Sequence, residues 1–146
     1  MASPYNSAKT GYMDSYNAAH AKVMINGIPV YGFGQDDMVS VSFSQDRQSF
    51  SQDPQGTGVR SINNKTGATI TVNLSVMSPA RKMMTALLNN TEEFKFDFAD
   101  DSVHFYSNYC FINKSPDYQA GNTAGNRAWA ITAINLMEDS VGGNDY

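Results

Sequence analysis

The chain has 146 residues, of which 41% are apolar, so it can bury the core of one domain, and this composition argues against wholesale disorder. The chain has 14 Asp and Glu residues and 10 Lys and Arg residues. The resulting net charge of -4 argues against a protein that binds nucleic acid by neutralising its phosphates. The single cysteine, Cys110, allows neither an intramolecular disulfide nor a thiolate metal cluster, which fits a protein folded in a reducing cytoplasm.

The first segment is small and polar, without helical or strand periodicity, and we expect an N-terminal arm over residues 1–17. It lacks the basic and then apolar pattern of a signal peptide, and no later run approaches the ~18 apolar residues of a membrane span. Next, Asn26-Gly27 separates two apolar runs and predicts a β-hairpin, because a type I′ turn needs two residues that tolerate positive φ. Pro29 cannot donate a ladder hydrogen bond, which places this hairpin at a sheet edge.

Residues 38–44 and 67–77 alternate between apolar and polar side chains, and each segment is predicted to form a strand. One face is apolar in both, as in Val39, Val41 and Phe43. The other face carries only small uncharged polar residues: Ser40, Ser42, Ser44, Thr69, Thr71, Asn73 and Ser75. Exposed strands of soluble monomers normally carry charge. The pattern therefore suits a channel wall or a seam between subunits, although an ordinary solvated sheet face would also fit it.

Residues 46–66, between these strands, show no periodicity and are predicted to form a long inter-strand loop. Loops of about twenty residues are uncommon in compact domains and are usually functional. Both charged and large apolar side chains occur in it: Arg47, Phe50, Asp53, Val59, Arg60, Ile62 and Lys65.

A helix is predicted from Pro79 to Leu88, with Ser78 as N-cap, Pro79 at the first helical position and a left-handed cap at Asn89-Asn90. Its apolar residues follow the helical stripe, and at roughly ten residues it must pack on a sheet to persist.

Further strands are expected over residues 94–98, 103–112 and 127–137, followed by a frayed tail over residues 138–146. The expected fold is mainly β, of α+β type: a single domain over residues 1–146 that forms an antiparallel β-barrel or sandwich with one short flanking helix.

The sequence shows no constellation of catalytic, cofactor-binding or metal-binding residues. His104 and Cys110 are expected on one face of the same strand, but six residues separate their Cα atoms by roughly 20 Å, too far to share an ion. The acidic pairs, such as Asp100-Asp101, fall in predicted turns. We therefore expect no enzyme, no cofactor and no metal.

Three segments, taken together, resemble the tail tube proteins of contractile-tailed bacteriophages. They are SPARKMMTALLNN, then FKFDF, then NYCFINKSPDYQAGNTAGNRAWAITAINL. The resemblance covers roughly residues 20–138 and rests on the order and spacing of several weak motifs.

The resemblance implies a β-barrel or sandwich subunit that closes into hexameric rings, with sheets paired across subunits. The rings would stack into a tube inside a contractile sheath, with baseplate and tail terminator proteins at its ends. Such a subunit belongs to the virion and assembles in the host cytoplasm, and DNA would cross the lumen without tight binding. Residues 46–66 would then be the arm that reaches the next ring.

Related tubes occur in bacteriocins and type VI secretion, so the cargo does not follow from the fold. The sequence is also compatible with a tail terminator or baseplate protein and, less closely, with a cytoplasmic small-ligand-binding β-barrel.

Overall fold

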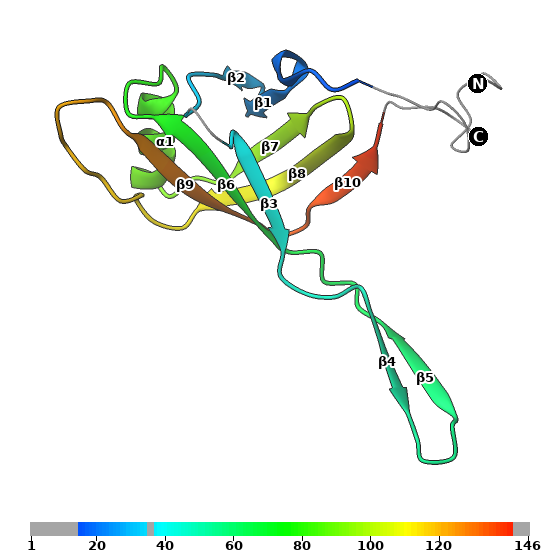
Figure 1. Ribbon diagram of the computed structural model, residues 1–146. Coiled ribbons are helices and arrows are strands. Elements are labelled where there is room, and N and C mark those ends of the chain that lie inside the picture. Colours follow the sequence, from blue (N-terminus) through cyan, green and yellow to red (C-terminus); the bar gives the residue numbers. More distant parts are fainter. Residues whose placement is uncertain (1–14, 35–36, 142–146) are drawn as a thin grey trace.

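A computed structural model describes residues 15–34 and 37–141 of the chain. Among these described residues, ten strands and one α-helix follow a short 3-10 helix at Ala18–His20. The strands are β1 (Lys22–Ile25), β2 (Ile28–Val30), β3 (Val39–Phe43), β4 (Gln48–Gln52), β5 (Gly58–Ile62), β6 (Ala68–Ser75), β7 (Phe94–Ala99), β8 (Val103–Ile112), β9 (Asn126–Ala133) and β10 (Met137–Ser140). The helix α1 spans Arg81–Asn89. The expected class, a mainly β fold with antiparallel strands and one short helix, is confirmed (Figure 1).

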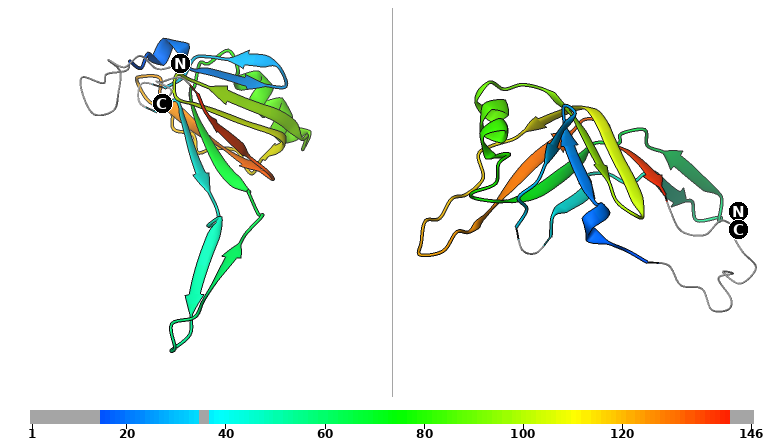
Figure 2. Two further views of the ribbon diagram at one scale, coloured as in Figure 1. Left: turned by 90° about the vertical axis from the view of Figure 1, so that its right-hand side faces the viewer. Right: turned by 90° about the horizontal axis from the view of Figure 1, so that it is seen from above.

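Eight of the strands form one sheet in the order β2-β1-β7-β8-β9-β6-β3, with β10 paired to β8. Strand β8 joins two halves of this sheet, because its first part pairs with β7 and β10 and its last part pairs with β9. The inner faces of the halves meet in the core (Figure 2). The largest side chains there are Trp129, Phe94 and Phe96, which are almost fully buried. The interior is therefore filled by side chains.

The predicted β1–β2 hairpin is confirmed. Asn26 and Gly27 connect the strands with φ values of 53° and 78°, as a type I′ turn requires. The Asn26 side chain also accepts a hydrogen bond from the Lys95 backbone N–H, which ties the turn to β7. Pro29 lies on β2, an edge strand of the sheet, as expected.

Helix α1 begins two residues later than predicted and ends without the predicted left-handed asparagine. Ser78 Oγ accepts a hydrogen bond from the Ala80 N–H and donates one to the Tyr31 carbonyl. The buried Ser78 hydroxyl therefore anchors the turn before the helix to the chain after β2. Asn90 is right-handed, and Thr91 takes the positive φ of 50° instead.

Residues 46–66 do not form the irregular loop that was expected from the sequence. They contain β4 and β5, which pair antiparallel in a separate two-stranded sheet that projects from the body (Figure 1). The expected tail is also corrected, because residues 137–140 form β10 against β8. The last predicted strand is thus two strands, β9 and β10. Residues 142–146, and residues 1–14 of the expected arm, lie outside the described residues.

Replacing Leu87 by Ala tests whether α1 contributes to the core. Leu87 is buried, and Met84 beside it is fully buried. We expect the free energy of unfolding to fall by about 2–5 kcal/mol, because the truncation leaves a cavity. Urea unfolding measures the change, with the exposed Thr85→Ala as control. An unchanged midpoint for Leu87→Ala would show that the helix is peripheral.

Candidate functional site

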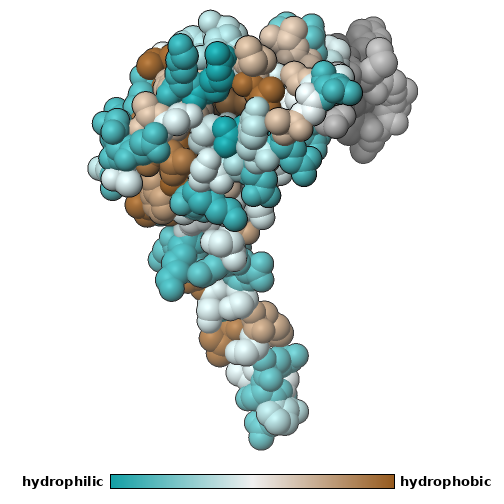
Figure 3. Space-filling view, turned by 90° about the vertical axis from the view of Figure 1, so that its left-hand side faces the viewer, coloured by the Kyte–Doolittle hydropathy of each residue, from teal (hydrophilic) through white to brown (hydrophobic). Residues whose placement is uncertain are grey.

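The seven residues singled out in the segment 46–66 all lie on the β4–β5 hairpin or at its base. Phe50, Val59 and Ile62 are 67%, 61% and 62% exposed, respectively, although they are large and apolar. Figure 3 shows an apolar zone partway along the projecting hairpin, with hydrophilic residues at the tip. The sequence therefore gathers apolar side chains on an element that its own body does not cover.

The register of the hairpin divides its side chains between two faces. Phe50 lies opposite Arg60, and Ile62 lies opposite Gln48, so these four residues share one face. The other face carries Val59 and a row of serines: Ser49, Ser51 and Ser61. We call the first of these the Phe50 face.

Gly58 leaves space for the Phe50 ring over the opposite strand. A Cβ added at Gly58 would overlap Phe50 Cε2, so the ring occupies the space above this glycine. An aromatic ring that covers a glycine across a strand pair shields exposed backbone. The glycine thus leaves room for the Phe50 ring on this face, where the ring remains largely exposed.

The remaining residues of this group stand at the turn and the base of the hairpin. Asp53 lies in the turn, where its Oδ1 accepts hydrogen bonds from the N–H groups of Gln55 and Thr57. Arg47 and Lys65 lie at the base, where the Asn63 N–H donates to the Arg47 carbonyl over 2.7 Å. The carboxylate of Asp53 therefore shapes the turn, while Arg47 and Lys65 flank the junction with the body.

The second predicted group lies on the outer face of the half-sheet formed by β3, β6 and β9. Ser40 lies opposite Thr71, and Ser42 lies opposite Thr69. Asn73 and Ser75 continue the row on β6, and Ser44 continues it beyond β3, where it bonds Gly67.

The contribution of β9 to this face was not predicted from the sequence. Ala128, Ala130 and Thr132 lie opposite Asn73, Thr71 and Thr69, respectively. The signal was present, because these small residues alternate with Trp129 and Ile131 along the last predicted strand. The outer residues of β3, β6 and β9 form a continuous surface without charge, which we call the uncharged face.

The outer side of the other half-sheet carries ionisable groups. His104 Nε2 lies 2.9 Å from Asp97 Oδ1, and the His104 ring contacts that of Tyr106. The expectation that His104 and Cys110 share a face is wrong, because β8 contains a bulge between them. Ser107 and Cys110 both point inward, whereas an unbroken strand would alternate them. Burial raises the pKa of the Cys110 thiol.

The turn after β7 holds the segment before β1 through its two aspartates. Although partial burial acts to raise the pKa of Asp100, backbone hydrogen bonds from Ser102 and Val103 hold it below its ordinary value. The backbone N–H of Asn17 donates to Asp101, and His20 Nδ1 lies 2.9 Å from the same carboxyl. Hydrogen bonding from Asn17 and His20 lowers the pKa of Asp101. The two carboxylates are thus local anchors, as their predicted place in a turn suggested.

Within residues 15–34 and 37–141, the only carboxylate ion pairs are those of His20 and His104. The lysines and arginines of this region have no such partner among the described residues. No group of three or more His, Cys, Asp or Glu residues at the described positions could hold a metal ion. In the same part of the chain, no helix has the length and apolar character needed to cross a membrane.

No protein-family model matches the sequence, and no curated protein sequence matches it. Chains of similar fold occur in three solved structures of contractile injection systems. A chain in the cap of the anti-feeding prophage, its tube-terminating cap, is 13% identical with a TM-score of 0.64, over 88% of this chain and 93% of that one.

The second structure is the sheath-tube complex of the extracellular contractile injection system PVC in its extended state. A chain in it is 14% identical with a TM-score of 0.64, over 87% of this chain and 93% of that one. The third is the sheath/tube terminator of PVC, with 14% identity, a TM-score of 0.66, and 87% and 98% of the two chains covered. The protein therefore has a fold found in contractile injection systems.

Proposed function

We propose that the protein is the subunit of a tail tube: it forms hexameric rings that stack into a conduit inside a contractile sheath. The observation that carries this proposal is the β4–β5 hairpin, which extends from the body with its apolar residues exposed. Exposed apolar surface of this kind marks protein–protein contact. The fold shared with chains of contractile injection systems supports the same role.

The hairpin is the contact between successive rings. At ~3.3 Å per residue, the chain from Ser44 to Phe50 can project at most roughly 20 Å beyond the end of β3. It therefore reaches another subunit while its own body stays in its ring. Arg47, Arg60 and Lys65, which lack acidic partners among the described residues of their own chain, supply polar contacts there.

The uncharged face lines the lumen. Its hydroxyl, amide and methyl groups offer DNA phosphates no cation to bind, and the net charge of -4 in every subunit gives the whole tube a negative potential. DNA then passes without tight binding. The charged half-sheet and α1, with Arg81 and Lys82, face the sheath.

Closure of the ring joins sheet edges of neighbouring subunits. Strands β2 and β3 end the sheet on either side and leave backbone groups unpaired along their outer edges. Pairing across subunits satisfies these groups and builds one continuous barrel.

Negative-stain electron microscopy and analytical ultracentrifugation of the purified chain test the proposal directly. We expect rings with a central channel, and stacks of rings as the protein concentration rises. Monomers at every concentration would contradict it and would favour a binding protein that does not polymerise.

A second candidate is a tube terminator, because two of these three structures are a terminating cap and a terminator. A terminator is expected to form single rings that do not stack on one another. The same micrographs therefore separate the two candidates.

Amide hydrogen exchange should distinguish the free subunit from the tube at residues 56–65. An isolated two-stranded hairpin is marginally stable in water, so its amides should exchange rapidly in the monomer. They should become protected in stacked rings, while amides of β6 keep the same protection in both states. Equal protection of the hairpin in both states would contradict a role in stacking.

Replacing Thr71 by Lys tests the assignment of the lumen. Thr71 lies in the middle strand of the uncharged face, so a hexameric ring would acquire six inward cations. We expect wild-type tubes to ignore DNA and Thr71→Lys tubes to bind it with an affinity that falls steeply with salt. Filter binding at several salt concentrations measures this, with Thr85→Lys, at an exposed position of α1, as the control that adds a cation on the outside. If the Thr71→Lys variant does not form closed rings, the uncharged face lies between neighbouring subunits and does not line the lumen.

A further inference from the structure

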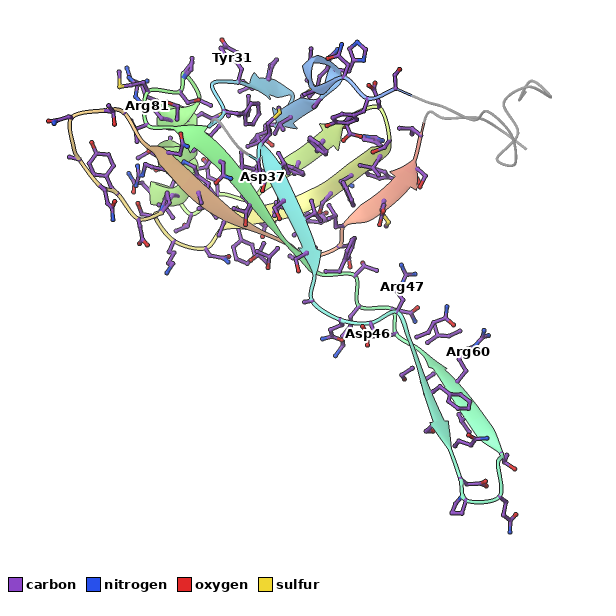
Figure 4. All side chains as sticks on the ribbon, in the orientation of Figure 1. Tyr31, Asp37, Asp46, Arg47, Arg60 and Arg81 are labelled. Carbon is purple, nitrogen blue, oxygen red and sulfur yellow. The ribbon has the colours of Figure 1, made fainter. Side chains whose placement is uncertain are left out.

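Two surfaces at opposite ends of β3 complement each other. Figure 4 shows Asp37 just before β3, at the end remote from the hairpin, and Arg60 on the hairpin beyond the other end. A cavity of about 300 Å³ opens beside Asp37. Because the hairpin leads away from the body, it does not reach this cavity of its own chain.

The cavity combines an apolar wall with negative charge. The described residues of its lining include Met38, Val39, Phe98, Tyr16 and the two carboxylates of Asp37 and Asp100, and none of these lining residues is a Lys or Arg. Asp100 is engaged by Ser102 and Val103. The Asp37 side chain is exposed and has no polar partner among the described residues, so its carboxylate is free to accept a donor.

The Phe50 face of the hairpin has the opposite composition. Phe50 and Arg60 lie opposite each other in register, and the Phe50 ring lies over Gly58. The Phe50 face thus presents an aromatic side chain and a guanidinium group next to each other. Arg47 is a poorer partner for a distant carboxylate, because it lines a different cavity with Glu138 and Asp139 of its own chain.

We infer that the cavity beside Asp37 receives the Phe50 face of a second copy of this chain. Phe50 packs against Met38 and Phe98, and the Arg60 guanidinium donates hydrogen bonds to the Asp37 carboxylate. A charge-assisted pair beside an apolar contact sets both register and affinity. The inference rests on the proposed stacking of rings and names the surface that receives the hairpin.

A charge exchange tests the pair. Arg60→Glu and Asp37→Arg should each raise the protein concentration needed for stacking by about tenfold or more, because each places like charges together. The double variant should return to within about threefold of wild type. Arg47→Glu is the matched control, and Asp37→Arg should not rescue it. Equal defects in the single and double variants would overturn the pairing of Arg60 with Asp37.

Cross-linking tests the contact without relying on charge. Phe50→Cys and Met38→Cys chains are each mixed as a minority with wild-type chains, which keep the stacks together, and are then assembled and oxidised. They should give a disulfide-linked dimer in stacks and none in unstacked rings. The buried Cys110 stays out of this reaction. Ser49→Cys, on the other hairpin face, is the control partner.

These experiments can reject the proposed docking contact without rejecting the proposed stacking of rings. Stacked tubes without the Phe50–Met38 cross-link would overturn the inference and leave the tube proposal standing. A wild-type chain that never stacks would overturn both.

Discussion

Replacing Trp129 by Ala is expected to lower the free energy of unfolding by about 3–5 kcal/mol. Trp129 is 2% exposed, lies opposite Val72 on β6 and belongs to the core between the two half-sheets. A loss of this size approaches the total stability of many domains, so part of the variant should be unfolded at room temperature. Urea unfolding followed by circular dichroism measures the change.

Tyr118→Ala is the matched control. The Arg127 guanidinium lies 5.2 Å from the Trp129 ring and 5.4 Å from the Tyr118 ring, so both rings make the same cation contact. Tyr118 is 62% exposed, and its loss should cost less than about 1 kcal/mol. Equal losses in the two variants would mean that the cation contact, and not burial, accounts for the effect.

Removing the hairpin is expected to abolish stacking and leave the subunit folded. Ser44 and Gly67 already bond each other at its base, so Gln45 and Thr66 can be joined through Asn-Gly as a two-residue turn. The free energy of unfolding should stay within about 1 kcal/mol of wild type, because no core residue is lost and the closed loop becomes shorter. Sedimentation velocity measures the assemblies that remain.

A pair of double variants locates the effect within the hairpin. Phe50→Ser with Ile62→Ser removes the apolar groups of the Phe50 face, whereas Ser49→Ala with Ser61→Ala alters the other face. The first pair should prevent stacking, and the second should leave it intact. If the hairpin-deleted chain stacks as well as wild type, the hairpin has no part in ring contacts.

Most of the sheet could be predicted from the sequence, because one face of each main strand is buried. Alternation marks β6 clearly, since Ile70, Val72 and Leu74 face the core and polar residues separate them. The Asn-Gly turn was equally predictable, because backbone geometry restricts the residues that fit it.

The hairpin and β10 escaped prediction because neither face of either element is buried. The residues of β4, β5 and β10 are all exposed, so no pattern of burial appears in their sequences. Hydrophobic periodicity detects strands by their contact with a core. It does not detect strands that are held by backbone pairing alone.

The sequence identified individual residues of the candidate site, but it did not show which of them lie together on one surface. Composition alone singled out Phe50, Arg60 and the polar rows of β3 and β6. The pairing of Phe50 with Arg60, and the part that β9 has in the uncharged face, depend on strand register. Single-sequence patterns do not contain that register. The bulge in β8 was hidden for the same reason.

The placement of the hairpin at one end of the subunit gives the proposed polymer a direction. When a contact between two different surfaces repeats along the stacking axis, it produces an open polymer. Each added ring presents the same free surface as the one before it, so the contact itself does not limit the length of the polymer. One terminus of the filament then carries unoccupied hairpins, and the other carries vacant cavities. If the chain forms such a tube, the protein that starts it and the one that ends it would have to recognise different surfaces of this subunit, and a component other than this subunit would have to set the length.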